Sequence, residues 1–194
     1  AGSELDFMSM RLAHTLGGNI TLENENKINQ YLEELELTMC REVQEPMTKD
    51  TLKALMKTFN QGIKMEDEEM ALVMKYEGEL QWIAQTTHPL LSTSVSIIAS
   101  MKKLQIPGTF AAVKRIFKWL KGVKDHCLVR RKGNKDGSQW WSDSDFAGLW
   151  ATTGERRTRT GILWELFGMA AVWISRFQQC RGTEYHEDDE GGEA

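Results

Sequence analysis

The chain has 194 residues, of which 41% are hydrophobic and 27% are charged, a composition typical of a globular protein with a buried core. No apolar run approaches the roughly 20 residues that span a bilayer, and no signal peptide opens the sequence. We therefore expect an intracellular protein, cytoplasmic or nuclear, with no membrane partner. The three cysteines are far apart and predict neither a zinc site nor a disulfide framework.

The net charge of −4 hides a strong asymmetry along the chain. Residues 1–80 hold 8 Lys and Arg against 16 Asp and Glu, whereas residues 81–181 hold 16 against 6. The last 13 residues add six acids and no Lys or Arg. A basic module between acidic flanks is suited to a phosphate backbone, and it is equally suited to pairing with the acidic half of the same protein.

The first third of the chain predicts a hairpin, a helix and a connector. Residues 4–22 alternate apolar and polar side chains around a glycine pair, which predicts a β-hairpin. Residues 24–37 carry an apolar stripe at helical spacing and predict an amphipathic helix. Residues 40–65 predict an exposed connector with a short helix at 52–58, and this connector is the best candidate for a domain boundary.

Three further helices are predicted at 66–85, 90–104 and 108–124, with an acidic run before the first and a proline before each of the others. The third has an apolar face and a basic outer face. Its basic residues are Lys114, Arg115, Lys118, Lys121 and Lys124. Such a face is either simply solvated or follows a phosphodiester backbone.

After residue 125 the pattern changes to β-strands, at 127–131, 139–145, 160–167 and 171–176. Glycine-containing turns between them predict an antiparallel meander of three or four strands. Residues 186–194 are acidic and glycine-rich, and we expect a disordered tail. The predicted fold class is therefore α+β, with an N-terminal hairpin and helix, a helical connection, and an antiparallel meander.

The candidate site lies in the strand 139–145. Asp143 and Asp145 are two residues apart, so both side chains would lie on one face of an extended strand. A cation relieves the repulsion between two such carboxylates, and Mg²⁺ takes oxygen ligands of this kind. The alternative is a polar strand end with a solvated Asp145.

Six stretches carry motifs in a characteristic order and spacing. They are Pro46-Met47-Thr48, the segment from Tyr76 to Pro89, the helix 111–122, Ser142-Asp143-Ser144-Asp145-Phe146-Ala147-Gly148, the turn 156–161, and Val172-Trp173-Ile174-Ser175. Together they resemble the Pol polyprotein of copia-type retrotransposons over nearly the whole chain. In that family, the segment that resembles residues 142–148 opens the ribonuclease H domain.

The resemblance implies a division of the chain. Residues 1–65 would be the end of the reverse transcriptase (thumb or connector), and 66–125 a helical connection. Residues 126–185 would be a partial ribonuclease H-like domain, followed by the acidic disordered tail at 186–194. Such domains cut the RNA strand of an RNA–DNA hybrid with two metal ions held by carboxylates. The implied partners are an RNA–DNA hybrid or other nucleic acid and the rest of Pol.

Position by position, the resemblance implies that Asp143 is the first catalytic acid and Glu184 the second. Asp143 and Glu184 would bind Mg²⁺ (or Mn²⁺), and Asp145, which is not a core ligand of the family, would be a substitute metal ligand beside them. Arg156 and Arg157 would join the basic helix in binding nucleic acid. The family's later Asp and the polymerase Tyr-x-Asp-Asp motif are absent, so we expect an incomplete Pol fragment. The alternative function is a non-catalytic nucleic-acid-binding module, or an inactive remnant, that uses the basic 108–124 helix.

Overall fold

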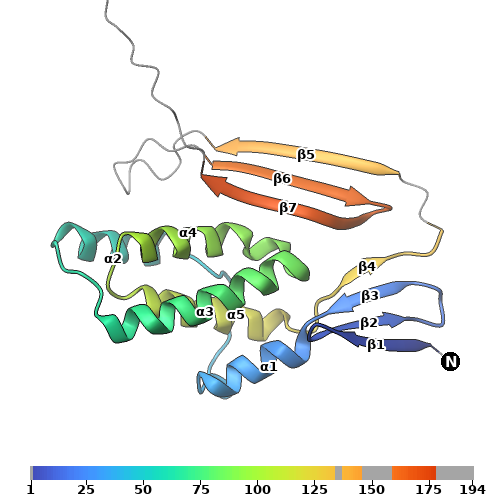
Figure 1. Ribbon diagram of the computed structural model, residues 1–194, viewed down its shortest axis with the longest axis horizontal. Helices are drawn as coiled ribbons and strands as arrows, with labels where there is room; N and C mark the ends of the chain where they lie inside the picture. The colour runs from blue at the N-terminus through green and yellow to red at the C-terminus, as the bar shows by residue number, and fades with distance from the viewer. Residues whose placement is uncertain (1, 134–136, 146–158, 178–194) are drawn as a thin grey trace, which may run out of the picture.

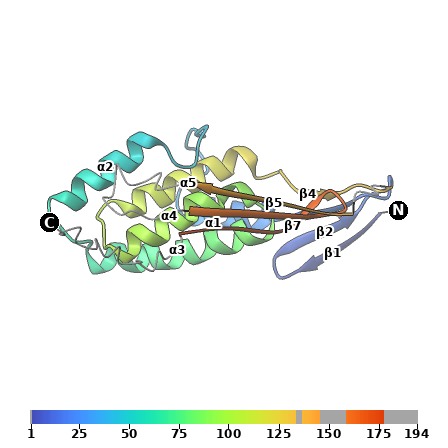
Figure 2. The same cartoon turned by 90° about the horizontal axis from the view of Figure 1, so that it is seen from above.

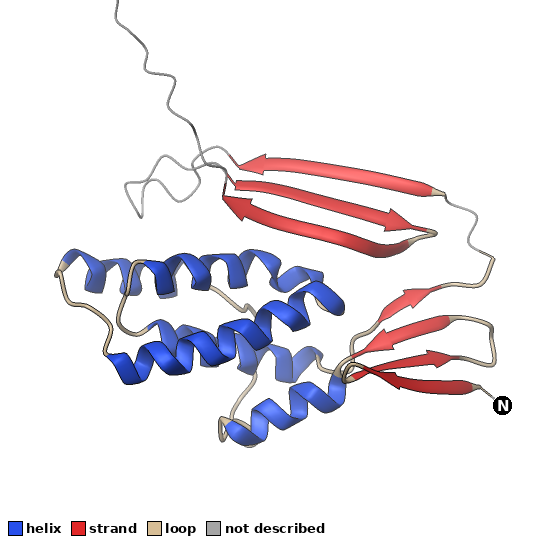
Figure 3. Cartoon of the chain, in the orientation of Figure 1, coloured by secondary structure: helices blue, strands red, loops and turns tan. Residues whose placement is uncertain are grey.

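The computed structural model describes residues 2–133, 137–145 and 159–177. This part of the chain contains five α-helices, one short 3₁₀ helix and two antiparallel sheets, which confirms the predicted α+β class. The helices pack together into one bundle, with one sheet lying over it and the other at one end of it (Figures 1 and 3).

The first sheet has four strands in the order β1-β2-β3-β4. Its strands are β1 (Ser3–Phe7), β2 (Met10–His14), β3 (Ile20–Glu23) and β4 (Leu128–Arg130). The predicted hairpin at 4–22 is therefore wrong in one respect, because it holds three strands rather than two. Met8 and Ser9 form an additional turn with φ of 50° and 63°. Two-residue hairpin turns with positive φ usually contain Asn-Gly. Met-Ser does not have this sequence signature, so the turn was not predicted.

The second sheet has the order β5-β6-β7, with β5 (Ser138–Asp145), β6 (Arg159–Leu166) and β7 (Met169–Phe177). This confirms the three-stranded form of the predicted meander. The first of the four predicted strands, 127–131, is not part of it, because β4 pairs instead with β3. A strand pattern in the sequence specifies which residues share a face, but it does not specify the partner strand.

The helices lie close to their predicted positions. They are α1 (Glu25–Glu34), α2 (Lys49–Asn60), α3 (Asp67–Thr86), η1 (Pro89–Leu91), α4 (Ser92–Lys103) and α5 (Thr109–Val123). Helix α2 is longer than expected, because Thr48 caps it by accepting a hydrogen bond from the N–H of Thr51 (3.1 Å). Within the described residues, no helix combines the length and the hydropathy needed to cross a membrane.

The helices share one hydrophobic core. Ile28, Leu80 and Phe117, from α1, α3 and α5, are fully buried at its centre. Leu55 and Met56 of α2 belong to the same cluster. Residues on both sides of position 65 therefore contribute to one core.

The N-terminus of α5 is capped by a side chain from α3. The Glu69 carboxylate accepts hydrogen bonds from the N–H groups of Gly108 (3.3 Å) and Phe110 (3.0 Å). Gly108 has a φ of 84°, a conformation that glycine adopts without strain. A negative charge at this position also interacts favourably with the helix dipole. The acidic run that begins α3 thus also fixes the start of α5.

We predict that Glu69→Ala lowers the free energy of unfolding by about 1 kcal/mol, the usual cost of a lost helix cap. Glu68→Ala is the matched control, because Glu68 lies in the same first turn of α3 and is exposed. Urea unfolding of both variants measures the difference. Equal losses would show that the contact with α5 contributes nothing.

His88 lies buried between the end of α3 and the end of α5, with 4% of its surface exposed. Its Nδ1 lies 2.8 Å from the Thr87 hydroxyl, and its Nε2 lies 3.3 Å from the Val123 carbonyl oxygen. If Nε2–H donates to the carbonyl, the neutral ring satisfies both contacts. Burial lowers the pKa of His88, against an opposing contribution from the Val123 carbonyl.

We predict that this histidine makes the fold sensitive to acid. Because its pKa is lower in the folded than in the unfolded state, the unfolded chain takes up the proton first as the pH falls below about 6.5. The free energy of unfolding should therefore decrease between pH 7.5 and 5.5, and less steeply in His88→Gln. Denaturant unfolding across this range tests it, with His14→Gln, at an exposed position, as control. Identical slopes in wild type and His88→Gln would contradict it.

Candidate functional site

Asp143 lies on β5, on the sheet face that is turned toward the helices. Its cross-strand neighbours are Gly161 on β6 and, beyond it, Ser175 on β7. Gly161 has no side chain, and even an added Cβ would meet nothing closer than 3.8 Å, the distance to the Asp143 carbonyl oxygen. The exposed Asp143 carboxylate therefore has open space beside it.

A groove of about 760 Å³ runs between this sheet face and the start of the α4 region. Trp141, Leu163 and Trp173 form its apolar wall on the sheet side. Leu90 and Thr93 lie on the opposite wall, and Leu90 is 76% exposed. The sequence did not predict that Leu90 and Thr93 form this wall, because nothing in the residues around them indicates that a strand distant in sequence packs nearby.

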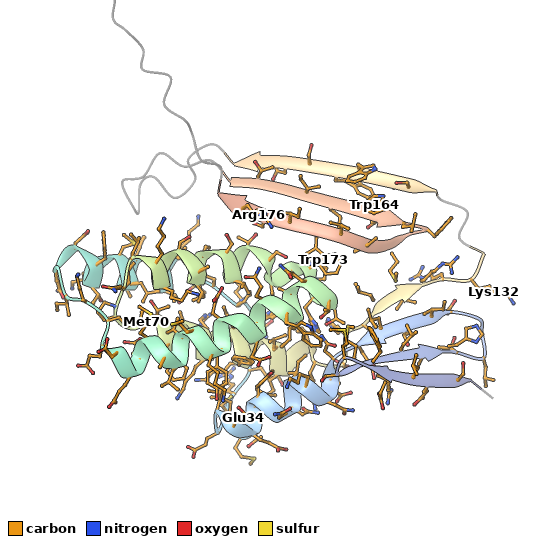
Figure 4. All side chains as sticks on the ribbon, in the orientation of Figure 1. Glu34, Met70, Lys132, Trp164, Trp173 and Arg176 are labelled. Atoms are coloured by element: carbon orange, nitrogen blue, oxygen red, sulfur yellow. The ribbon has the colours of Figure 1, made fainter. Side chains whose placement is uncertain are left out.

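Two contacts hold the sheet over the helices. The indole N–H of Trp173 donates to the carbonyl oxygen of Ala84 at the end of α3. The hydroxyls of Thr93 and Ser175 lie 3.2 Å apart and share a hydrogen bond. Figure 4 shows Trp173 below the sheet, directed at the helices, and Figure 2 shows the strands lying over them. The Thr93–Ser175 contact joins the two walls of the groove beside Asp143.

The two adjacent tryptophans, Trp140 and Trp141, lie on opposite faces of the sheet, as neighbouring residues of a strand do. Trp141 lines the groove, whereas Trp140 stacks on Trp164 on the outer face, with ring centroids 5.0 Å apart and planes 7° from parallel. Trp140 remains largely exposed there. The outer face of this sheet is therefore also apolar.

The predicted metal ligands are only partly described. Asp145 follows Asp143 at the strand period, so the backbone places them on one face, but the Asp145 side chain lies outside the described part. Glu184, Arg156 and Arg157 also lie outside the described residues. Within the residues that the structure describes, no group of three or more His, Cys, Asp and Glu side chains could hold a metal ion. The magnesium site therefore stays a prediction.

The basic face of α5 is partly engaged within the protein. The Lys121 ammonium donates to the carbonyl oxygen of Cys40 (2.7 Å). The Lys124 ammonium contacts the Asn29 side chain (2.9 Å) and the Glu25 carboxylate (3.2 Å). These two lysines therefore bind the acidic half of the chain, and none of their contacts involves the groove beside Asp143.

The remaining cations of this face are Lys114, Arg115 and Lys118, and all three are half-buried. Lys114 lies over the ring of Phe110, 5.0 Å from its centroid. The described residues provide no carboxylate partner for any of the three within ion-pair distance. Three of the five basic residues of this helix face therefore have no ion pair within the described part of the chain.

Comparison with known proteins places the chain among relatives of transposon proteins. It is 32% identical over 124 residues to the retrovirus-related Pol polyprotein from transposon RE2 of Arabidopsis thaliana, covering 63% of this chain and 8% of that protein. It is 30% identical over 105 residues to the retrovirus-related Pol polyprotein from transposon TNT 1-94 of Nicotiana tabacum, covering 53% and 8%. An uncharacterized mitochondrial protein of Arabidopsis thaliana, AtMg00810, is 31% identical over 101 residues, covering 52% and 40%.

The relationship to copia-type Pol polyproteins that the sequence motifs predicted is thereby confirmed. The chain spans about 8% of the length of the two Pol polyproteins. No protein-family model and no solved structure matched it.

We predict that Trp173→Phe loosens the sheet from the helices, because phenylalanine keeps an aromatic ring and loses the indole donor to Ala84. The free energy of unfolding should fall by about 1 kcal/mol, the usual value of one hydrogen bond. Hydrogen exchange should be faster in β7. Trp164→Phe is the matched control, because the Trp164 N–H donates within the sheet, to Ser138. Unchanged exchange in β7 of Trp173→Phe would contradict the prediction.

Proposed function

We propose that the chain is a piece of a retrotransposon Pol polyprotein that joins the end of a reverse transcriptase (1–65) to a ribonuclease H-like domain (126–185) through a helical connection (66–125). Its function within Pol would be cleavage of RNA in RNA–DNA hybrids. The observation that carries the proposal is the position of Asp143, exposed on the first strand of a three-stranded antiparallel meander and beside an open groove.

The groove offers groups suited to a nucleic-acid strand. Asp143 lies beside Gly161, so a phosphodiester can approach its carboxylate without meeting a side chain at position 161. The hydroxyls of Thr93 and Ser175, which share a hydrogen bond, line the same groove and add polar surface to it. Trp141 lines the groove too and is 46% exposed, so its ring is available to stack on a base or pack on a sugar.

The proposed cofactor is Mg²⁺, or Mn²⁺ in its place. The Asp143 carboxylate at the groove would supply oxygen donors, which suit hard cations, and we propose Asp145 as a neighbouring ligand. We propose Glu184 as a third carboxylate, since two acids offset too little of the charge of two divalent ions. A bound metal ion would supply electrostatic stabilisation of the charge that develops on the scissile phosphate. Asp143 would hold its carboxylate at the groove, next to the apolar wall that contains Trp141.

The second candidate is a non-catalytic nucleic-acid-binding module. It rests on Lys114, Arg115 and Lys118, which have no carboxylate partner within ion-pair distance among the described residues. The internal contacts of Lys121 and Lys124 reduce the charge available to it. This candidate predicts binding that weakens steeply with salt and does not depend on Asp143.

We predict that Asp143→Asn lowers the rate of RNA cleavage in a labelled RNA–DNA hybrid, with Mg²⁺ or Mn²⁺ present, by on the order of 10²-fold, the usual loss when one group that stabilises developing charge is removed. Asp125→Asn is the matched control, because Asp125 is exposed and lies just beyond α5. It should cleave like the wild type.

A second measurement tests the proposal independently of the rate of RNA cleavage. Binding of Mn²⁺, followed by its quenching of tryptophan fluorescence, should weaken in Asp143→Asn and remain unchanged in Asp125→Asn. The proposal would be overturned if the chain binds the hybrid in a salt-sensitive way but does not cleave it, and if Asp143→Asn has no effect on Mn²⁺ binding. This result would favour the non-catalytic module.

A further inference from the structure

Strand β1 is the outer edge of the four-stranded sheet in the part of the chain that the structure describes. It pairs with β2 on one side, and no described strand pairs with its other side. All five of its residues, Ser3–Phe7, are exposed. Alternate residues of an edge strand direct their N–H and C=O groups away from the sheet, so β1 presents a template for another strand.

One face of this edge is apolar. Leu5 and Phe7 lie on it, each 59% exposed. Leu5 begins a row of leucines that crosses the whole sheet, because the residue pairs in register are Leu5 with Leu12, Leu12 with Leu22, and Leu22 with Leu128. An added strand with apolar residues in register would extend this row and cover Leu5 and Phe7.

The other face of the edge is acidic. Glu4 and Asp6 lie on it, and Asp6 is opposite Arg11, which in turn is opposite Glu23. Arg11 and Glu23 form a salt bridge of 2.6 Å. The row therefore reads negative, positive, negative from the edge inward, and a cation next to Asp6 would continue the alternation. A polar groove of about 220 Å³ on the same side is lined by Asp6, Glu23 and Glu25 and also by Arg11 and Lys27, so its lining carries charges of both signs.

The same charges disfavour pairing between two copies of this edge. In an antiparallel pair that keeps the apolar faces together, Leu5 opposite Leu5 places Glu4 opposite Asp6 of the other copy. Shifting the register by two residues places Glu4 opposite Glu4, or Asp6 opposite Asp6. Every such register opposes two carboxylates, and like charges directly opposite each other are destabilising.

We propose that the β1 edge receives a strand from a partner in which apolar residues alternate with Lys or Arg. The added strand would hydrogen-bond to the outward backbone groups of β1, place its apolar side chains beside Leu5 and Phe7, and pair its cations with Glu4 and Asp6. This inference uses neither Asp143 nor its groove and is independent of the proposed function.

A charge-reversed copy of the chain provides the probe. The double variant Glu4→Lys/Asp6→Lys has the basic, apolar edge that the proposal requires. Mixed with the wild type, it should form a heterodimer in which Glu4 and Asp6 of the wild type face the introduced lysines. Each chain alone should stay monomeric. Sedimentation equilibrium at low salt measures the association, which should be lost near 1 M salt because the charges are screened.

The matched control is Glu36→Lys/Glu45→Lys, which changes the net charge equally at exposed positions outside the sheet. Circular dichroism establishes that both variants fold. Three outcomes would each overturn the proposal. The mixture of wild type and Glu4→Lys/Asp6→Lys stays monomeric, the control variant associates with the wild type equally well, or the wild type alone dimerises through β1.

A second measurement does not depend on folding of the variant. A seven-residue peptide of alternating Lys and Val, added to the wild type, should slow hydrogen exchange of the β1 amides. A peptide of alternating Glu and Val should leave that exchange unchanged. Equal effects of the two peptides, or none from either, would contradict the charge rule.

Discussion

The packing of three aromatic rings is the interaction on which the rest of the structure depends. Tyr31 of α1, Tyr76 of α3 and Phe117 of α5 meet edge to face, with centroids 5.7 to 6.2 Å apart, and all three are buried. Edge-to-face pairs prefer particular orientations, so this contact fixes how the three helices cross as well as that they touch. Because Glu69 also joins α3 to the start of α5, both ends of that pair of helices are set.

Both sheets take their positions from this helical bundle. Strand β3 leads directly into α1 and β4 follows α5, so the packing of α1 against α5 brings the two strands together across more than 100 residues of chain. The second sheet is placed by Trp173, whose indole reaches the end of α3. The groove beside Asp143 is consequently formed by two separate contributions, a strand face and the segment that follows α3.

Local patterns predicted the elements well and their long-range partners poorly. The stripe of Ile28, Tyr31 and Leu32 encodes α1, because helical spacing alone determines which side chains are buried. The turn at Met8 and the pairing of β4 with β3 were not predicted, because the nearby residues contain no sequence pattern that is typical of either. The same reason hid Leu90 and Thr93, which reach the candidate site through tertiary packing.

The basic and acidic parts of the sequence are only partly paired with each other in the structure. Part of the basic surplus is used internally, because Lys121 and Lys124 bind acceptors in the acidic half of the chain. Lys75 and Glu34 form a further pair between α3 and α1. The carboxylates of the β1 edge have no such partner within ion-pair distance among the described residues, although a salt bridge lies just behind them in the same sheet. Arg11, the cation opposite Asp6, is bound to Glu23, so an edge that repels its own copy is best satisfied by a basic strand from elsewhere.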